Sequence, residues 1–245
     1  MKLMTKWSQM VINLMKWSTY GRITKKLFDQ QMAYKKAMRY FKQGLVRNDK
    51  LVSPSKEEQL AFIDYYMTLV KIDLVSSKKL GAFWEREFEE RFLPDPFVVG
   101  SKMIYPTQKT GKIEKMSLNE WTYIATWKSR SLIDTFFKVR RTGFKQNSNH
   151  DGYYYKELDL LYVYNGRHSA TVGTVLGGEM EVEVVSIEEM YKQNIVTDGA
   201  YWYCFSVWNN DKRIGDIDDF RIAVLYELSR QKWLLENKGK MELWF

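Results

Sequence analysis

The sequence predicts an α+β fold, in which a helical N-terminal region packs on a small mixed-sheet core and a C-terminal helix follows. Three observations carry this prediction. Apolar residues recur at helical spacing through residues 1–95, short β-rich runs alternate with helical segments after residue 96, and the chain closes on an acid-led helical stretch. With 45% hydrophobic and 16% aromatic residues, the chain can bury a substantial core.

The first elements are two helices. Residues 3–17 place apolar side chains at i, i+3/i+4 and i+7 spacing, which is typical of one buried helix face. Arg22–Gln43 carries a second stripe of this kind, crowded by lysines and arginines. A basic helix with interleaved aromatics can follow a phosphate backbone or lie on a membrane, but it can equally pack on the rest of the protein with its lysines solvated.

Two further helices complete the basic helical region, residues 1–95. Either Ser53 is an N-cap followed by a proline, or Ser55 forms a capping box with Glu58, and both alternatives predict a helix to about Ile72. A short helix is expected over Leu80–Phe92. Prolines 94 and 96 end it and mark the boundary to a second domain, residues 96–245.

The second domain alternates strands and helices. A capping box at Ser117–Glu120 predicts a helix over Asn119–Arg141 that ends near Gly143. The other expected elements are strands at Phe97–Tyr105, Gly111–Met116, Tyr153–Tyr155, Leu158–Tyr164, Met180–Val185 and Tyr201–Val207, and helices at Ser169–Leu176 and Ile217–Glu236.

A turn between a predicted strand and a predicted helix is the candidate site. It consists of Asn165, Gly166, Arg167, His168 and Ser169. A turn that opens a helix directs backbone N–H groups at whatever lies above it, and anions bind there readily. We expect these five residues to bind phosphate, with His168 as the candidate catalytic proton-transfer group.

Each residue of this turn also has a structural interpretation. The Asn-Gly pair can be there because the turn needs a positive φ. His168 can be a structural hydrogen bonder, and Ser169 is most simply the N-cap of the following helix. A nucleophilic serine would need a base and an orienting acid. His150 lies in a polar loop and could come near, but nothing in the spacing requires it.

No metal site is expected. Asp216, Asp218 and Asp219 are spaced like a Mg²⁺ or Ca²⁺ cluster, yet the acidic start of a helix explains them better. The single cysteine, Cys204, excludes an intrachain disulfide and a multi-cysteine zinc site, and it suits a reducing compartment. No uncharged apolar run is long enough for a transmembrane segment, and no signal peptide is apparent, so a cytoplasmic location is expected.

Positive charge is concentrated in two blocks. Residues 1–50 hold 12 Lys and Arg against 2 Asp and Glu, and residues 102–145 hold 10 against 3. Such blocks attract nucleic acid, an anionic membrane or an acidic protein, unless the acidic blocks of the chain neutralise them. The candidate nucleic-acid contacts are Lys25, Lys26, Lys35, Lys36, Arg39, Lys138, Arg140 and Arg141.

The order of elements over residues 98–185, with the Gly166-Arg167-His168-Ser169 box opening a helix, resembles the core of the ParB/sulfiredoxin-like superfamily, whose equivalent box binds nucleotide phosphate. Ser169 stands where that superfamily has its phosphate-binding arginine, and Arg167 stands where sulfiredoxins have their cysteine. The resemblance therefore implies a phosphate site without thiol chemistry, in which Arg167 would supply the guanidinium. The Asn-Gly-x-His-Ser motif also resembles an uncharacterised bacterial or phage family.

Two functions follow as expectations. The first is a nucleotide- or nucleic-acid-binding protein that holds phosphate at Asn165–Ser169. A nucleotide, with or without Mg²⁺, would be its ligand, and a nuclease or nucleotide hydrolase is its catalytic variant. The second is a non-catalytic interaction protein of phage or plasmid type, active in defence or counter-defence, whose basic helices bind a protein partner. The single displaced arginine favours a binding protein over an enzyme.

Overall fold

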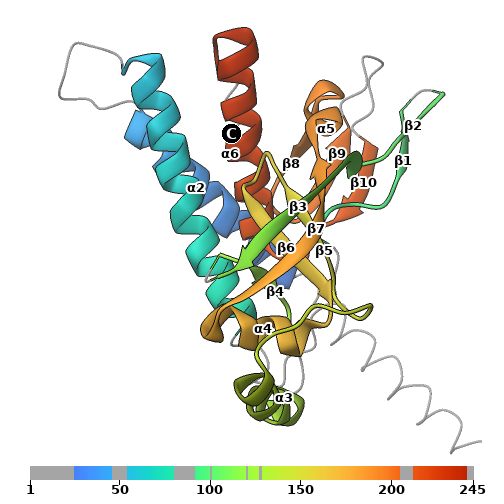
Figure 1. Cartoon of the computed structure of the whole chain (residues 1–245). Coiled ribbons are helices and arrows are strands. Elements are labelled where there is room, and N and C mark those ends of the chain that lie inside the picture. The colour runs from blue at the N-terminus through green and yellow to red at the C-terminus, as the bar shows by residue number, and fades with distance from the viewer. Residues whose placement is uncertain are drawn as a thin grey trace, which may run out of the picture.

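A computed structural model of the chain describes residues 25–45, 54–79, 92–99, 101–119, 121–126, 129–204 and 212–241. Its helices and mixed sheets confirm the α+β class, with a helical N-terminal region and a C-terminal helix (Figure 1). The apolar stripe expected at residues 3–17 and most of the helix expected at Leu80–Phe92 lie outside the described residues, as does the end of the strand expected at Tyr201–Val207. No helix among the described residues is long and apolar enough to cross a bilayer.

A five-stranded mixed sheet forms the centre of the molecule. Its strands lie in the order β3 (Gln108–Leu118), β7 (Gly178–Ser186), β5 (Asp151–Tyr155), β6 (Leu160–Asn165) and β4 (Tyr123–Ile124). The β4–β6 and β5–β7 pairs are parallel, and the β3–β7 and β5–β6 pairs are antiparallel. Because β5 and β6 form a hairpin, the residues just before β5 lie beside those just after β6.

Two smaller sheets accompany the central one. The first is a hairpin of β1 (Phe97–Val99) and β2 (Lys102–Ile104), which replaces the single strand expected over Phe97–Tyr105. The second has the order β10 (Lys212–Asp216), β9 (Tyr201–Cys204) and β8 (Ile195–Thr197), and the short helix α5 (Glu188–Lys192) precedes it.

Three long helices pack together on one side of the sheet. They are the helix of residues 25–45, α2 (Lys56–Lys79) and α6 (Phe220–Lys238) (Figure 1). Met38 and Phe41 of the first helix, Leu74 of α2 and Tyr226 of α6 are buried in one continuous apolar cluster that also includes Trp202 of β9. The predicted helical region, residues 1–95, and the predicted second domain, residues 96–245, therefore both contribute to this cluster.

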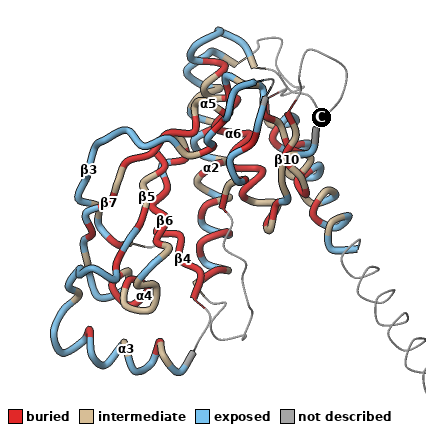
Figure 2. The backbone as a smooth tube through the Cα atoms, turned by 90° about the vertical axis from the view of Figure 1, so that its right-hand side faces the viewer, coloured by how far each residue is buried: buried red, intermediate tan, exposed pale blue. Residues whose placement is uncertain are grey.

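The candidate site lies at the opposite end of the sheet, where α4 (Arg167–Leu176) covers one face and α3 (Ser129–Thr142) packs on α4 (Figure 1). Ala170 of α4 is buried against Val163 and Val182 of the sheet. Leu132 and Val139 are the buried residues of α3, and they contact Val172 of α4. Most of the remaining α3 surface is exposed (Figure 2).

The helix predicted over Asn119–Arg141 is wrong in its first part. Asn119 instead makes a turn, in which its Oδ1 accepts the Trp121 N–H at 3.0 Å. Tyr123–Ile124 then pairs with β6 as β4, and α3 begins only at Ser129. The helical spacing of these apolar residues is overridden by a parallel strand pairing that the local sequence does not signal.

The helix after the Ser-Pro signal is longer than predicted. Ser55 and Glu58 form the reciprocal capping box, with Ser55 N donating to Glu58 Oε2 at 2.7 Å and Glu58 N to Ser55 Oγ at 3.2 Å. The helix then continues to Lys79 rather than to Ile72. Lys71 and Lys78 face inward and are buried in ion pairs, so charged residues interrupt the apolar pattern that sequence reasoning followed.

Candidate functional site

Gly166 shapes the turn between β6 and α4. It is the N-cap of α4 and has a left-handed backbone with φ 70°, as predicted for the Asn-Gly pair. The Asn165 side chain accepts the Gly166 N–H at 3.0 Å and donates to Asp151 Oδ2 at 3.1 Å. A Cβ on Gly166 would lie 2.4 Å from the His150 ring, so the close approach of that ring also requires glycine.

The Arg167 side chain donates hydrogen bonds to backbone carbonyls at the ends of β6 and β4. Its Nε donates to the Tyr164 carbonyl at 2.9 Å, and its Nη1 donates to the Ala125 carbonyl at 3.2 Å. Burial lowers the pKa of Arg167 to about 10. These contacts join the end of β6 to the segment after β4. The phosphate contact expected of this guanidinium stays a prediction.

Ser169 lies at the third helical position of α4, so its predicted role as N-cap is wrong. The N-cap is Gly166, which makes no side-chain cap. Ser169 Oγ instead lies 2.9 Å from the Gly166 carbonyl and 2.6 Å from Nε2 of His150. His168 is partly buried beside it in the first turn, and its catalytic role stays a prediction.

The second histidine of the chain therefore joins the site. His150 is 7% exposed, and its Nδ1 lies 2.9 Å from Asn147 Oδ1. Phe144 packs edge-on against the imidazole with ring centroids 5.1 Å apart. Burial lowers the pKa of His150, which favours the neutral ring at pH 7. We call Ser169, His150 and Asn147 the serine relay.

The signal for this contact was present in the sequence but indirect. His150 immediately precedes β5, and Ser169 follows β6 by four residues. If the two strands are read as an antiparallel hairpin, the loop before the first strand must lie beside the helix after the second. Sequence spacing alone does not show this contact.

Positive charges elsewhere in the described chain are mostly neutralised within the molecule. Ion pairs to carboxylates are made by Lys71, Lys78, Lys102, Lys109, Lys115, Lys156, Lys192, Lys232, Arg213, Arg221 and Arg230. Among the described residues, none of the candidate contacts on the helix of residues 25–45 and none of those on α3 forms an ion pair. The candidate contacts on the helix of residues 25–45 and on α3 are therefore not neutralised by carboxylates of the described residues.

The exposed face of α3 combines these charges with aromatic rings. Ile133, Phe136 and Phe137 are 53%, 40% and 54% exposed, and the two phenylalanine rings contact edge to face with centroids 5.5 Å apart. At 3.6 residues per turn, Arg140 lies about 40° around the helix from Phe136, and Arg141 lies about 40° from Phe137. Basic and aromatic side chains therefore alternate around one exposed arc.

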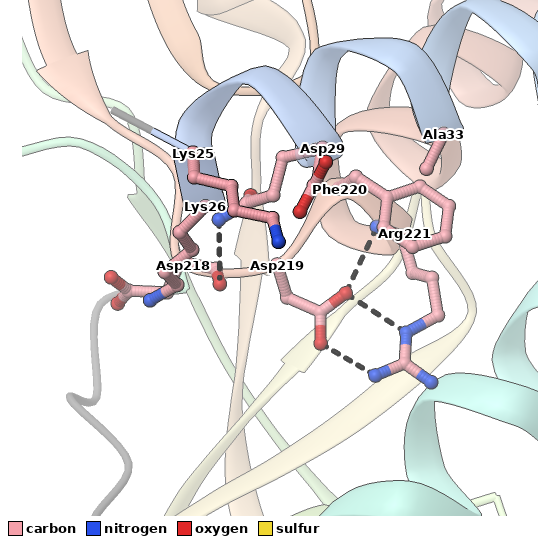
Figure 3. A pocket seen from close by; sticks show the side chains of 9 residues that line it. Lys25, Lys26, Asp29, Ala33, Asp218, Asp219, Phe220 and Arg221 are labelled. Atoms are coloured by element: carbon pink, nitrogen blue, oxygen red, sulfur yellow. Dashed lines mark hydrogen bonds and ion pairs between the residues drawn. The ribbon is translucent and has the colours of Figure 1, made fainter. Parts of the chain in front are cut away.

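A pocket of about 550 Å³ lies between the helix of residues 25–45 and the start of α6 (Figure 3). Lys25, Lys26 and Asp29 face Asp218 and Asp219 across it. Of the three carboxylates spaced like a metal cluster, Asp218 and Asp219 thus line a pocket with two lysines, whereas Asp216 pairs with Arg213. No group of three or more residues able to hold a metal is found in the described part of the chain.

Asp219 has a structural role at this pocket. It caps α6 by accepting the Arg221 N–H at 3.1 Å, and its two oxygens accept from the Arg221 guanidinium at 2.8 and 2.7 Å. Lys78 of α2 lies 3.4 Å away. Burial alone would raise the pKa of Asp219, but the hydrogen bonds and charge of Arg221 and the charge of Lys78 outweigh it and lower the pKa.

A second hollow of about 450 Å³ follows the outer side of the same N-terminal helix. Lys35, Lys36, Arg39 and the exposed Tyr40 line it, together with Met32. Three candidate contacts are thereby gathered on one helix face. The other candidate contacts, Lys138, Arg140 and Arg141, belong to α3, so the structure divides the predicted contacts between two helices.

Comparison with known proteins gives a family but no biochemistry. No curated protein and no solved structure matches the chain significantly. The model of a family of unknown function, DUF6710, matches residues 11–239, which is nearly the whole sequence. The chain therefore belongs to the DUF6710 family.

Proposed function

We propose that this protein binds single-stranded nucleic acid and that the exposed face of α3 is its contact surface. The observation that carries the proposal is the alternation on that face of unpaired basic residues, Arg140 and Arg141, with the exposed rings of Phe136 and Phe137. Proteins that bind single strands without sequence preference combine these two elements, a basic track for the backbone and aromatic rings for the bases.

The charges on α3 are free to act on a ligand. The only acidic residue of α3 is Asp134, against four basic residues, Arg130, Lys138, Arg140 and Arg141. None of these four forms an ion pair among the described residues. Lysines of the neighbouring sheet edge, such as Lys109 and Lys115, are neutralised by glutamates of β7. A polyanion would therefore be drawn to α3 rather than to β3.

The arrangement of the rings favours a nucleic acid over a membrane. A helix that lies on a bilayer separates an apolar face from a charged face. On α3, the residues that form the separate apolar stripe, Leu132 and Val139, are already buried against α4. The exposed arc mixes rings with guanidinium groups, so each ring has a cation beside it. Stacked bases with their phosphates match that pattern.

The turn at Asn165–Ser169 lies at the same end of the molecule as α3, because α3 packs on α4 (Figure 1). The first turn of α4 can accept a phosphate of a strand that follows α3, as expected for that turn. The helix of residues 25–45 would add a second, independent basic surface for a longer strand.

Fluorescence anisotropy with a labelled single-stranded oligonucleotide tests the proposal. The double variant Arg140→Gln, Arg141→Gln should weaken binding about tenfold or more, and Phe136→Ala, Phe137→Ala should weaken it by a similar factor through lost stacking. The matched control is Lys109→Gln, Lys115→Gln, which also removes two positive charges from the surface.

The control variant should bind nearly as well as the wild type. Equal weakening by the control would show that only net charge matters and would refute the assignment to α3. Binding to anionic vesicles in place of the oligonucleotide would instead support a membrane role, and absence of binding to both would favour an acidic protein partner.

A further inference from the structure

We infer that the serine relay is a nucleophilic site, in which Ser169 attacks small carboxylic esters and His150 is its general base. This inference does not depend on nucleic-acid binding at α3, although it uses the same first turn of α4 that is proposed above as a phosphate contact. Ser169 Oγ and His150 Nε2 are 2.6 Å apart, and His150 Nδ1 and Asn147 Oδ1 are 2.9 Å apart. Nucleophile, base and orienting group are therefore all within hydrogen-bond distance.

Asn147 contacts Nδ1 of His150 through its backbone N–H and its side-chain oxygen, and these two groups favour opposite tautomers. Asn147 Oδ1 accepts the Asn149 backbone N–H at 2.9 Å, which fixes the oxygen toward the imidazole. In the tautomer that the inference requires, Nδ1 carries the proton and donates it to Asn147 Oδ1, 2.9 Å away. The Nε2 lone pair then faces the Ser169 hydroxyl. The Asn147 backbone N–H, 3.1 Å from Nδ1, would favour the opposite tautomer, in which Ser169 donates only to the Gly166 carbonyl.

The position of Ser169 also suits the charge that develops during acyl transfer. It lies in the first turn of α4, where peptide N–H groups point out of the helix end and are outside the helix ladder. Such groups stabilise an oxyanion. Ser169 is partly exposed whereas His150 is buried, so the serine is the member of the pair that an ester would approach.

The chemical step balances with water as the second substrate. Ser169 Oγ bonds to the carbonyl carbon and its proton passes to His150 Nε2. The tetrahedral oxyanion collapses, the bond to the alcohol oxygen breaks, and the alcohol leaves with the proton from Nε2. Water then adds to the acyl-serine, giving its proton to Nε2, and the carboxylic acid leaves as Ser169 regains its proton.

A fluorophosphonate probe and p-nitrophenyl acetate test the inference on the full-length protein. The probe should label Ser169, identified by mass spectrometry of the modified peptide, and the ester should give a burst of p-nitrophenol equal to the protein concentration. Ser169→Ala should lose both signals, whereas Ser117→Ala, a control on an exposed strand, should keep them. Asn147→Ala should slow labelling about tenfold or more, while Asn147→Asp should restore it because a carboxylate also orients the ring.

His150 is buried, so replacing it can unfold the site. The role of His150 as general base is therefore tested through the two Asn147 variants. Each variant is first compared with the wild type by circular dichroism. A folded wild type that takes no label at Ser169 overturns the inference, as does labelling that Asn147→Ala leaves unchanged. Either result would assign the opposite tautomer and a purely structural role to the relay.

Discussion

Gly166 meets two constraints at once, and they can be separated by substitution. Gly166 and Gly143 both have φ near 70°, but a Cβ on Gly143 would meet nothing within 4 Å, whereas one on Gly166 would overlap the His150 ring. Gly143→Ala should therefore lower the free energy of unfolding by about 1 kcal/mol, the cost of left-handed backbone alone. Gly166→Ala should lower it by about 3 kcal/mol, because overpacking adds to that cost. Urea unfolding measures both, and equal losses would show that the His150 contact is not tight.

The buried pair of Glu227 and Arg230 on α6 makes a second prediction for single residues. Their side chains are each 2% exposed, and two hydrogen bonds of 2.8 and 3.0 Å join them. Arg230→Met should destabilise the protein by about 3–5 kcal/mol, since it leaves a buried carboxylate without its cation. Lys115→Met removes the cation from an exposed pair and should leave the unfolding transition close to wild type. Thermal melts followed by circular dichroism compare the two, and a similar loss in both would contradict the contrast.

Single residues were the least predictable part of the site. The sequence indicated the turn, its positive φ and the five residues of the box, because these depend on neighbours in the chain. It did not indicate that Arg167 bonds to the carbonyls of Tyr164 and Ala125, or that His150 lies against Ser169. Both facts depend on strand pairing between distant segments, which local patterns do not encode.

At the scale of elements, the N-cap residue of α6, Asp219, makes the stability of the fold depend on pH. Asp219 holds Arg221 and lies beside Lys78 of α2, and its pKa is lower in the folded chain than in the unfolded one. Its contribution to stability is therefore present above the unfolded value of about 3.9 and is lost as pH falls through the lower folded value. Asp219→Asn keeps a cap but removes the charge, and it should cost about 3 kcal/mol at pH 7.

This difference between wild type and Asp219→Asn should shrink as the pH is lowered below about 4. Urea titrations at a series of pH values measure it. A difference that stays constant from pH 7 to pH 3 would show that the charge of Asp219 does not stabilise the fold.

Elements with a local signal were predicted well, and those defined by distant pairing were not. The reciprocal capping box at Ser55 and Glu58 and the N-cap Asp219 of α6 are local start signals, and both helices form, although α2 extends beyond its predicted end. The strand β4 is two residues long and exists only because β6 lies beside it. Its apolar residues therefore looked like one turn of a helix.

At the scale of the whole molecule, the helix of residues 25–45 is part of the core as well as a basic surface. Met38, Phe41 and Leu45 are buried in the cluster that includes α2 and α6. Truncating one buried side chain of this size costs about 2–5 kcal/mol, and a whole domain is stable by only about 5–15 kcal/mol. Deleting residues 1–50 should therefore abolish the cooperative melt, and a sharp transition in the truncated chain would contradict the shared core.

Charge, in contrast, was predictable at this scale from composition alone. Each basic block contributes one helix, residues 25–45 or α3, whose cations make no ion pairs within the described residues, whereas Lys102, Lys109 and Lys115 of the second block are paired. What composition could not show is that exposed phenylalanines lie among the cations of α3, because that requires knowing which face of the helix α4 covers.

The salt dependence of binding tests the central claim, that α3 contacts a nucleic-acid backbone. The logarithm of the association constant for a single-stranded oligonucleotide should fall linearly with the logarithm of salt concentration, by about 0.7 for each phosphate contact. For Arg140→Gln, Arg141→Gln, the slope should be shallower than that of the wild type by about 1.4, because two contacts are lost. The Lys109→Gln, Lys115→Gln control should keep the wild-type slope. Parallel lines for the wild type and the α3 variant would contradict the account.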